Sequence, residues 1–209
     1  TMKKIMTLLT IAFATLLVGC ADSDVPQEGK QFQKLPVNLS TFRLPQVTEV
    51  FSLNCGHCKK MESVLPQLEE LTKQNIGKIH VTFNESAQVG AMIYYTAEMQ
   101  LGKKPEPSMM DELFTAAQMG DGATMAEKKQ AIDDAFHSRG LISPYELKED
   151  QQKQLFRAMQ VAEDITEKGQ INSVPTFIVN GKYMVLTSGH KDVEDIAKTI
   201  NYLTKNNPK

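Results

Sequence analysis

The alternation of hydrophobic and polar positions predicts a strand, a helix and a second strand at the start of the folded part. Residues 47–53 form a run rich in β-forming side chains, and from Lys59 the hydrophobic positions recur at helical spacing. Pro66 falls within this helix, and residues 75–77 supply a stop signal. Residues 79–83 then form the second strand. This order predicts a βαβ unit with parallel pairing of its two strands.

The middle of the chain has helical periodicity and no strand pattern. This all-helical block extends from about residue 86 to residue 168. Ser108, followed three residues later by Asp111, predicts a capping-box start for one helix. Residues 125–136 predict another helix, and a further one is expected to end at Gly169. The block therefore interrupts an α/β framework.

The strand pattern returns after the helical block. Residues 176–179 and 182–185 flank the dipeptide Asn180-Gly181, which is the strongest short-range signal for a β-hairpin. Residues 193–203 carry hydrophobic side chains at helical spacing and predict a final helix. The fold class expected from the whole pattern is α/β.

The first residues have the three parts of a secretory signal. Lys3 and Lys4 precede an uncharged, mostly apolar run at residues 5–18, which ends at Gly19 and Cys20. The run is shorter than the roughly 20 apolar residues that a membrane-spanning helix needs. We therefore expect a signal peptide that directs export.

Cys20 has a possible role of its own. Residues 17–20, Leu-Val-Gly-Cys, resemble the lipobox of bacterial lipoproteins, in which the cysteine becomes the lipidated first residue of the mature chain. The alternative is an ordinary signal peptide that is cut nearby, with Cys20 incidental. The polar residues that follow, to about residue 30, predict a flexible tether.

Composition and charge narrow the class of protein. Hydrophobic residues make up 41% and charged residues 23% of the 209 residues, and the mean hydropathy is −0.30. These values fit a soluble globular core and argue against a disordered chain or a polytopic membrane protein. There are 23 basic and 25 acidic side chains. The basic surplus of a nucleic-acid-binding protein is absent, so no nucleic acid partner is expected.

The strongest chemical signal is the sequence Cys55-Gly56-His57-Cys58. It lies where a predicted strand gives way to a helix inside a βαβ pattern, a context that indicates a thioredoxin-like redox site. Unpaired N–H groups and the positive end of the dipole at a helix N-terminus favour the thiolate form of Cys55. A protonated His57 adds positive charge. Both effects stabilise the reduced form, which makes the disulfide a better oxidant.

Two other interpretations of the cysteine pair remain open. A C-x-x-C sequence can form half of a zinc site, but a structural zinc site needs four ligands, and His80, His137 and His190 are scattered singly. The pair could also form an inert structural disulfide, although so short a loop adds little stability. We expect neither a metal nor another cofactor.

The chain resembles the DsbA family of exported thiol–disulfide oxidoreductases, which have thioredoxin folds interrupted by a helical domain. The resemblance runs from residues 29–32 to residues 179–183. Its most specific element combines Glu-Val-Phe-Ser at residues 49–52, the redox motif at residues 55–58, and Val-Pro at residues 174–175. It implies a thioredoxin-like fold with an inserted all-helical domain.

The resemblance also implies a division of the chain. Residues 1–19 would be the signal peptide and residues 20–30 the lipidated cysteine with its tether. Residues 31–85 would form the first part of the thioredoxin-like domain, which carries the redox site. Residues 86–168 would form the inserted helical domain, and residues 169–209 the second thioredoxin-like part.

The roles of individual residues follow from the same resemblance. Cys55 would be the exposed nucleophile and Cys58 its buried resolving partner, while His57 would tune Cys55. Val174 and Pro175 would form a loop that faces the site, with Pro175 in the cis configuration, and the backbone of this loop would bind a substrate strand. The resemblance carries the cis assignment, because few X–Pro bonds are cis.

Glu49 and Gly56 need separate comment. Glu49 falls in an otherwise apolar strand, where an unpaired charge is costly. In the family this position holds a buried acid that exchanges protons with the resolving cysteine, and Lys78 falls where its partner would be. The alternative is a solvated Glu49 at an edge.

DsbA itself has proline at the position of Gly56, so we expect a competent oxidase that is less oxidising than DsbA.

The function implied by the resemblance is the introduction of disulfide bonds into newly exported proteins. Its partners would be reduced or unfolded exported proteins and a membrane redox partner similar to the quinone reductase DsbB. The location would be the periplasm, with a lipid anchor, and a monomer is expected. Two alternatives stay open: a reductase or isomerase kept reduced by a membrane partner, and a non-catalytic lipid-tethered binding module.

Overall fold

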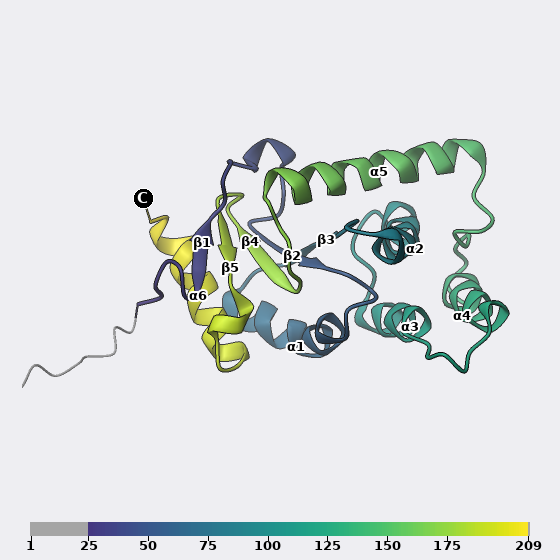
Figure 1. Ribbon diagram of the computed structural model, residues 1–209, viewed down its shortest axis with the longest axis horizontal. Helices are drawn as coiled ribbons and strands as arrows, with labels where there is room; N and C mark the ends of the chain where they lie inside the picture. The colour runs from purple at the N-terminus through teal and green to yellow at the C-terminus, as the bar shows by residue number, and fades with distance from the viewer. Residues whose placement is uncertain (1–24, 209) are drawn as a thin grey trace, which may run out of the picture.

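The computed structural model describes residues 25–208, which form a five-stranded sheet and six α-helices (Figure 1). The strands are β1 Phe32–Lys34, β2 Val47–Phe51, β3 Gly77–His80, β4 Thr176–Val179 and β5 Tyr183–Val185. The helices are α1 Gly56–Thr72, α2 Glu85–Leu101, α3 Pro107–Ala117, α4 Met125–His137, α5 Glu149–Lys168 and α6 Val193–Asn206. Short 3-10 turns occur at Ser40–Phe42 and Thr187–Gly189. The predicted α/β class is confirmed.

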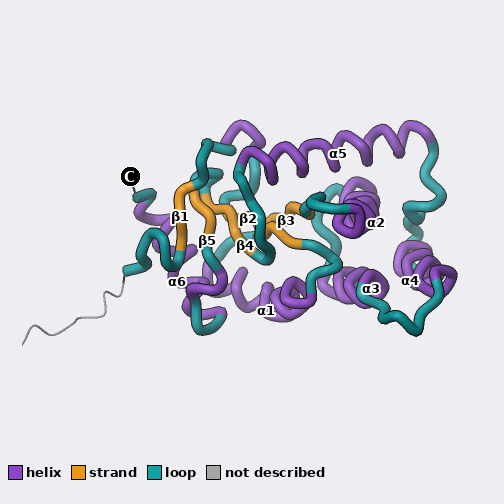
Figure 2. Tube along the Cα trace, viewed as in Figure 1, coloured by secondary structure: helices purple, strands orange, loops and turns teal. Residues whose placement is uncertain are grey.

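The order of the strands across the sheet is β1-β5-β4-β2-β3 (Figure 2). Strands β2 and β3 pair in parallel, which confirms the predicted βαβ unit, and Glu49 lies opposite Lys78 in their register. The other neighbouring pairs are antiparallel. Strand β2 is an interior strand, between β4 and β3, and from its end the chain passes into the redox motif.

The predicted hairpin joins β4 to β5. Asn180 and Gly181 have φ angles of 55° and 64°, so both residues of the turn adopt the left-handed conformation that this type of hairpin requires. A Cβ atom on Gly181 would lie 2.9 Å from the backbone nitrogen of Ser40. Glycine is therefore required at this position for its backbone conformation and for its small size.

Helices cover both faces of the sheet. Helices α1 and α6 pack together and enclose a hydrophobic cluster with strands β2, β4 and β5. A larger cluster joins β2 and β3 to the helices that lie between β3 and β4 in the sequence, α2, α3, α4 and α5. These four helices extend the molecule beyond the edge of the sheet, and α5 returns the chain to the sheet (Figure 1).

The ends of the predicted elements differ in places from the structure. Helix α4 begins at Met125 as expected, after a capping box formed by Thr124 and Glu127. The predicted start of α3 at a Ser108 cap is wrong. The helix begins at Pro107 instead, because proline has no N–H to satisfy and its fixed φ suits the first helical turn. Strand β1 was not among the predicted elements.

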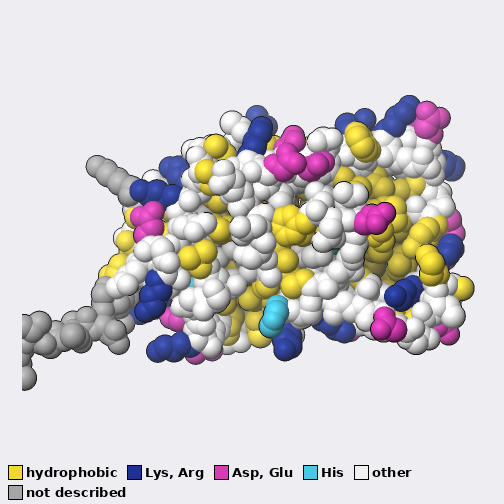
Figure 3. Space-filling model, in the orientation of Figure 1, with side chains coloured by type: hydrophobic (Ala, Val, Ile, Leu, Met, Phe, Trp, Pro, Cys, Tyr) yellow, Lys and Arg dark blue, Asp and Glu magenta, His cyan; other side chains and the backbone are white. Residues whose placement is uncertain are grey.

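The surface has one notable apolar region. Val89 and Met92 of α2 and Phe156 and Met159 of α5 line a shallow depression, and Phe156 is 68% exposed. Figure 3 shows hydrophobic side chains gathered on the right of the molecule, around α2, among scattered charges of both signs. Within residues 25–208, no helix is long and apolar enough to cross a membrane.

Candidate redox site

Cys55 is the N-cap residue of α1. Its backbone N–H donates to the Ser52 carbonyl at 3.1 Å, which closes a turn directly after β2. Its sulfur accepts the backbone N–H of Cys58 at 3.1 Å. Cysteine thus takes the place that serine or aspartate commonly fills at a helix start, where a side-chain acceptor satisfies an otherwise free N–H. The sulfur of Cys55 is therefore held over the N-terminal end of the helix.

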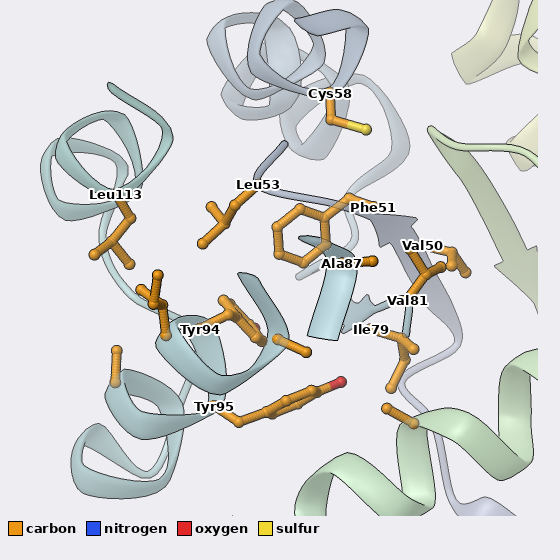
Figure 4. Packing of buried hydrophobic residues seen from close by; sticks show 14 of the residues in the cluster. Val50, Phe51, Leu53, Cys58, Ile79, Val81, Ala87, Tyr94, Tyr95 and Leu113 are labelled. Atoms are coloured by element: carbon orange, nitrogen blue, oxygen red, sulfur yellow. The ribbon is translucent and has the colours of Figure 1, made fainter. Parts of the chain in front are cut away.

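The two cysteines differ in exposure. Both are free thiols; Cys55 is partly exposed and Cys58 is fully buried. In Figure 4, Cys58 lies at the edge of the hydrophobic cluster, above Phe51 and Leu53. Burial raises the pKa of the Cys58 thiol, and a hydrogen bond with Cys55 adds to the effect. A substrate can therefore reach Cys55, whereas Cys58 strongly favours its protonated form.

The loop at residues 173–176 faces the redox pair, although it lies far away in the sequence. The Val174–Pro175 peptide bond is cis, which confirms the configuration that the resemblance implied. The S–H of Cys55 donates to the Val174 carbonyl oxygen at 3.8 Å. The hydroxyl of Thr187 donates to the Pro175 carbonyl at 2.9 Å and ties the loop to the segment after β5.

His57 and this loop line the same groove. The groove has a volume of about 790 Å³. It is lined by His57, Lys60, Met61 and Val64 of α1, by residues 173–176 and 186–188, and by residues 190–193 and Ile196 at the start of α6. The groove adjoins the loop whose Val174 carbonyl contacts Cys55, and its lining is mostly apolar with a few polar groups, a composition typical of ligand-binding sites.

A buried cluster of charges lies beneath the redox pair. The ammonium group of Lys78 contacts Glu49 Oε1 at 2.7 Å and Glu62 Oε2 at 2.6 Å. The side chains of Glu49 and Lys78 are each 1% exposed. The alternative of a solvated Glu49 is therefore wrong: the carboxylate lies inside the protein and is paired with Lys78, as the resemblance implied.

The carboxylate of Glu49 is less well stabilised by its neighbours than the ammonium group of Lys78. Burial raises the pKa of Glu49, and Lys78 only partly opposes the effect. Burial by itself would lower the pKa of Lys78, but the carboxylates of Glu49 and Glu62 outweigh it and the pKa is raised. Oε2 of Glu49 has no hydrogen-bond partner among the described residues. Glu49 is thus the carboxylate of this cluster with capacity to accept a proton.

The cluster also borders a second cleft, on the side of α1 away from the groove. This cleft has a volume of about 840 Å³, and Glu62 and Lys78 contribute to its lining. Glu69, Glu98 and Lys104 lie along the same cleft. The buried charges therefore approach solvent on one side and Cys58 on the other.

Sequence reasoning did not identify Glu62 or Gln118 as part of the site, and it assigned no role there to His80. Glu62 lies four residues after Cys58, so the two share a face of α1, and this spacing was a usable signal. His80 Nε2 accepts the N–H of Leu53 at 3.0 Å, and its Nδ1–H donates to the Val81 carbonyl at 2.7 Å. Burial lowers the pKa of His80 to about 4, so the imidazole is neutral.

Cys20 lies outside the described residues. Between Val25 and Pro208, no group of three histidine, cysteine, aspartate or glutamate side chains is close enough together to hold a metal ion. The structure brings Cys55, Cys58 and Val174 into contact, places His57, Val174 and Pro175 along the groove, and places Glu49 near Cys58.

Known proteins share these features. The family model for thioredoxin matches residues 44–202. The thiol:disulfide interchange protein DsbA of Haemophilus influenzae is 29% identical over 225 residues, which cover 97% of this chain and 98% of that protein.

Solved structures of DsbA proteins have the same fold. DsbA from Xylella fastidiosa has a TM-score of 0.67 at 20% identity and covers 88% of this chain and 98% of its own. A complex of Proteus mirabilis DsbA with the non-covalently bound peptide PWATCDS has a TM-score of 0.60 at 22% identity and covers 86% of this chain and 98% of its own. The chain belongs to the thioredoxin family and, within it, to the DsbA proteins, whose thioredoxin fold carries a helical insertion.

Proposed function

We propose that this protein is a thiol:disulfide oxidoreductase that introduces disulfide bonds into exported proteins through Cys55 and Cys58. The observation that carries the proposal is the arrangement of the two sulfurs. A partly exposed Cys55 lies at the start of α1 against the cis-proline loop, and Cys58 lies buried one helical turn further on. Similarity to DsbA proteins over almost the whole chain supports the same activity.

The reaction exchanges one disulfide for another. In the oxidised state Cys55 and Cys58 share a disulfide bond. A substrate thiolate attacks Sγ of Cys55, the bond to Cys58 breaks, and Cys58 leaves as a thiolate that takes up a proton. The second substrate thiolate then attacks the substrate sulfur of the mixed disulfide and releases Cys55 as a thiolate. Two electrons pass from the substrate, which gains a disulfide, to the pair of site cysteines.

Glu49 is assigned the proton exchange with Cys58. A thiolate released at Cys58 is buried and unfavourable, since burial raises the pKa of this thiol. Glu49 is close enough for its charge to raise that pKa further, and the pKa of its own carboxyl group is raised by burial. A protonated Glu49 can therefore supply the proton when the disulfide opens, and the carboxylate can take it back when the disulfide re-forms.

Val174 and Pro175 are assigned to substrate binding. Their loop presents a backbone carbonyl to Cys55 and also lines the groove, where an extended substrate segment can pair with its backbone. The peptide in the Proteus mirabilis complex contains a cysteine, which is the chemistry expected of a substrate segment here. His57, which lines the same groove, is assigned to stabilising negative charge on Cys55 when its imidazole is protonated.

The location and partners belong to the same proposal. Residues 1–19 act as a signal peptide for export to the periplasm, and Cys20 is the site of a lipid anchor. A membrane quinone reductase of the DsbB type takes the two electrons and two protons from reduced Cys55 and Cys58. The protein acts as a monomer on reduced or unfolded exported proteins, with the helical insertion at about residues 86–168 flanking the redox part.

Trapping of the mixed disulfide tests the proposal. In the variant Cys58→Ala no resolving thiol remains, so covalent adducts between Cys55 and substrate proteins should accumulate in cells and disappear when gels are run with reductant. The matched control is Cys55→Ala/Cys58→Ala, which should form none. Absence of reducible adducts from the Cys58→Ala variant contradicts thiol exchange.

The direction of the reaction needs a second measurement. Disulfide-form protein mixed with an equimolar reduced peptide carrying two cysteines should form one peptide disulfide for each Cys55–Cys58 pair that becomes reduced. In cells, alkylation of trapped thiols should find the pair mostly oxidised. A mostly reduced resting state would instead indicate a reductase.

A further inference from the structure

The turn that carries Cys55 is held by hydrogen bonds to three different elements. The N–H of Leu53 donates to His80 at the end of β3. The side-chain amide of Asn54 donates to the backbone carbonyl of Ser86 in α2 at 2.6 Å. The side-chain amide of Gln118, at the C-terminal end of α3, donates to two carbonyls of the same turn. The backbone groups of Leu53 and Cys55 and the side chain of Asn54 are therefore fixed by partners outside the turn.

Of these three contacts, only the one from Gln118 reaches the backbone of Cys55 itself. Its Nε2 lies 2.8 Å from the Leu53 carbonyl oxygen and 3.1 Å from the Cys55 carbonyl oxygen. One NH₂ group has two hydrogens, so it can serve both carbonyls at once. The Cys55 carbonyl also accepts the N–H of Lys59 at 3.1 Å, the first hydrogen bond of α1. Gln118 thus reinforces the point at which the redox helix begins.

The position of Gln118 is rigidly defined by the inserted helices. It is the C-cap residue of α3, and its backbone N–H donates to the Phe114 carbonyl at 3.0 Å. Leu113 and Phe114 of the same helix are fully buried. Figure 4 shows Leu113 on the same side of the hydrophobic cluster as Leu53. The side chain of Gln118 therefore projects onto the turn from a helix that is anchored in the core.

The electrostatic effect of this contact has a definite sign. The amide hydrogens of Gln118 carry partial positive charge and lie against the carbonyl of the residue whose sulfur becomes negative. They also polarise the peptide group that opens α1, because hydrogen bonds in a chain strengthen one another. Positive charge near a thiolate favours the thiolate. Gln118 should therefore stabilise reduced Cys55 more than the disulfide.

We propose that Gln118 is a positioning residue through which the inserted helix α3 fixes the Cys55 turn and makes the Cys55–Cys58 disulfide more oxidising. The inference rests on the proposed function, because it concerns the same disulfide exchange. The inserted helices would then help to determine how oxidising the Cys55–Cys58 disulfide is, in addition to covering the redox site.

The variant Gln118→Met tests the proposal, because methionine has a similar length and no N–H donor. At equilibrium with glutathione buffers, the ratio of disulfide to dithiol should rise by up to about fivefold, the value reached when the whole of one ordinary hydrogen bond is lost from the reduced form alone. Alkylation of Cys55 at neutral pH should slow by a similar factor, and the pH profile of the alkylation should move upward. Gln118→Glu replaces the donor by a carboxylate. It should raise the ratio of disulfide to dithiol further and slow the alkylation of Cys55 further than Gln118→Met does.

Thr115→Val provides the matched control. The hydroxyl of Thr115 accepts a hydrogen bond from Lys59 at 3.2 Å across the same α1–α3 contact, but it does not touch the turn. This variant should leave the glutathione equilibrium unchanged. A loss of stability alone, equal in the reduced and oxidised forms, also leaves that equilibrium unchanged, so the measurement separates positioning from folding.

The possible failures are distinguishable. If wild-type protein does not exchange disulfides with a dithiol peptide, the proposed function fails. If wild-type protein exchanges normally and Gln118→Met has the same glutathione equilibrium and the same alkylation profile, the role of Gln118 alone is refuted. A shift toward the dithiol form in Gln118→Met would also overturn the proposal, since it reverses the expected sign.

Discussion

Replacement of Lys78 by methionine tests the energetics of the buried charges. Lys78 contacts both Glu49 and Glu62, and its side chain is 1% exposed. Methionine fills a similar space but leaves two carboxylates without their cation. Removing one partner from a buried ion pair typically costs about 3–5 kcal/mol, because the remaining charge is desolvated and uncompensated. We expect a loss of this size in the unfolding free energy at pH 8.

The loss should depend on pH in a defined direction. Without Lys78, the pKa of Glu49 rises further above its ordinary value, because burial raises it and the main opposing charge is gone. Above about pH 4.5 the unfolded chain releases this proton while the folded protein retains it. The folded state then binds more protons, so its stability falls as pH rises. The difference from wild type should therefore be smaller at pH 5 than at pH 8 by more than about 1.4 kcal/mol, the linkage of one proton over one pH unit.

Urea denaturation under reducing conditions measures the effect. Circular dichroism is the suitable probe because the chain has no tryptophan. The slope of the unfolding free energy against urea concentration should stay unchanged. The double variant Lys78→Met/Glu49→Gln should lose most of the pH dependence. Lys73→Met is the matched control, since Lys73 pairs with Glu70 at a site where both side chains are 77% exposed, and it should have little effect.

Two results would refute the reasoning. One is a loss below about 1 kcal/mol at pH 8, well under the range for a broken buried pair. The other is an equal loss at pH 5 and pH 8, which would mean that no carboxylate near Lys78 changes its protonation on folding.

Three further predictions concern stability. In Gly90→Ala the new Cβ would lie 2.7 Å from His80 Nε2, so the imidazole ring must move. We expect the unfolding free energy measured by urea denaturation to fall by about 1–3 kcal/mol. An unchanged denaturation midpoint would contradict this contact. The pKa of buried His80 is about 4, below its unfolded value, so between pH 6.5 and 4 the unfolded state binds more protons than the folded state. The unfolding free energy should therefore fall by about 3 kcal/mol on acidification across this range. The variant His80→Asn should remove that part of the pH dependence. Thr124→Ala removes a capping box with Glu127 and should cost about 1 kcal/mol of thermal or chemical stability, whereas no change would show that α4 does not depend on this cap.

The features that could be predicted from the sequence depend on local chemistry. Asn180-Gly181 specified the hairpin because few residues tolerate two successive left-handed conformations. Gly169 marked the end of α5. The strand-to-helix transition at Cys55 followed from a change in the hydrophobic period at that point.

The features that could not be predicted depend on residues far apart in the sequence. Strand β1 has only three residues, too few to show a period, and its pairing with β5 defines it. Gln118 contacts the carbonyl of Cys55 across 63 residues of sequence, and nothing in its neighbourhood marks it. Val174 was found through family resemblance because no periodicity connects it to Cys55. The burial of Glu49 was suggested by its apolar strand and its pairing with Lys78 by the family resemblance; the strand register explains why the two residues lie opposite each other.

The long interval in sequence between Cys55 and Val174 has a consequence for the protein during its synthesis and folding. These residues are 119 positions apart, and β4, the antiparallel neighbour of β2, follows the whole helical insertion. As the chain emerges from its N-terminus, both cysteines are present long before the loop that faces them and before β2 has a strand on each side. Contacts between such distant segments form late, since each requires a long stretch of chain to close. A newly made molecule therefore passes through a stage in which it possesses reactive thiols but no surface with which to choose among other proteins.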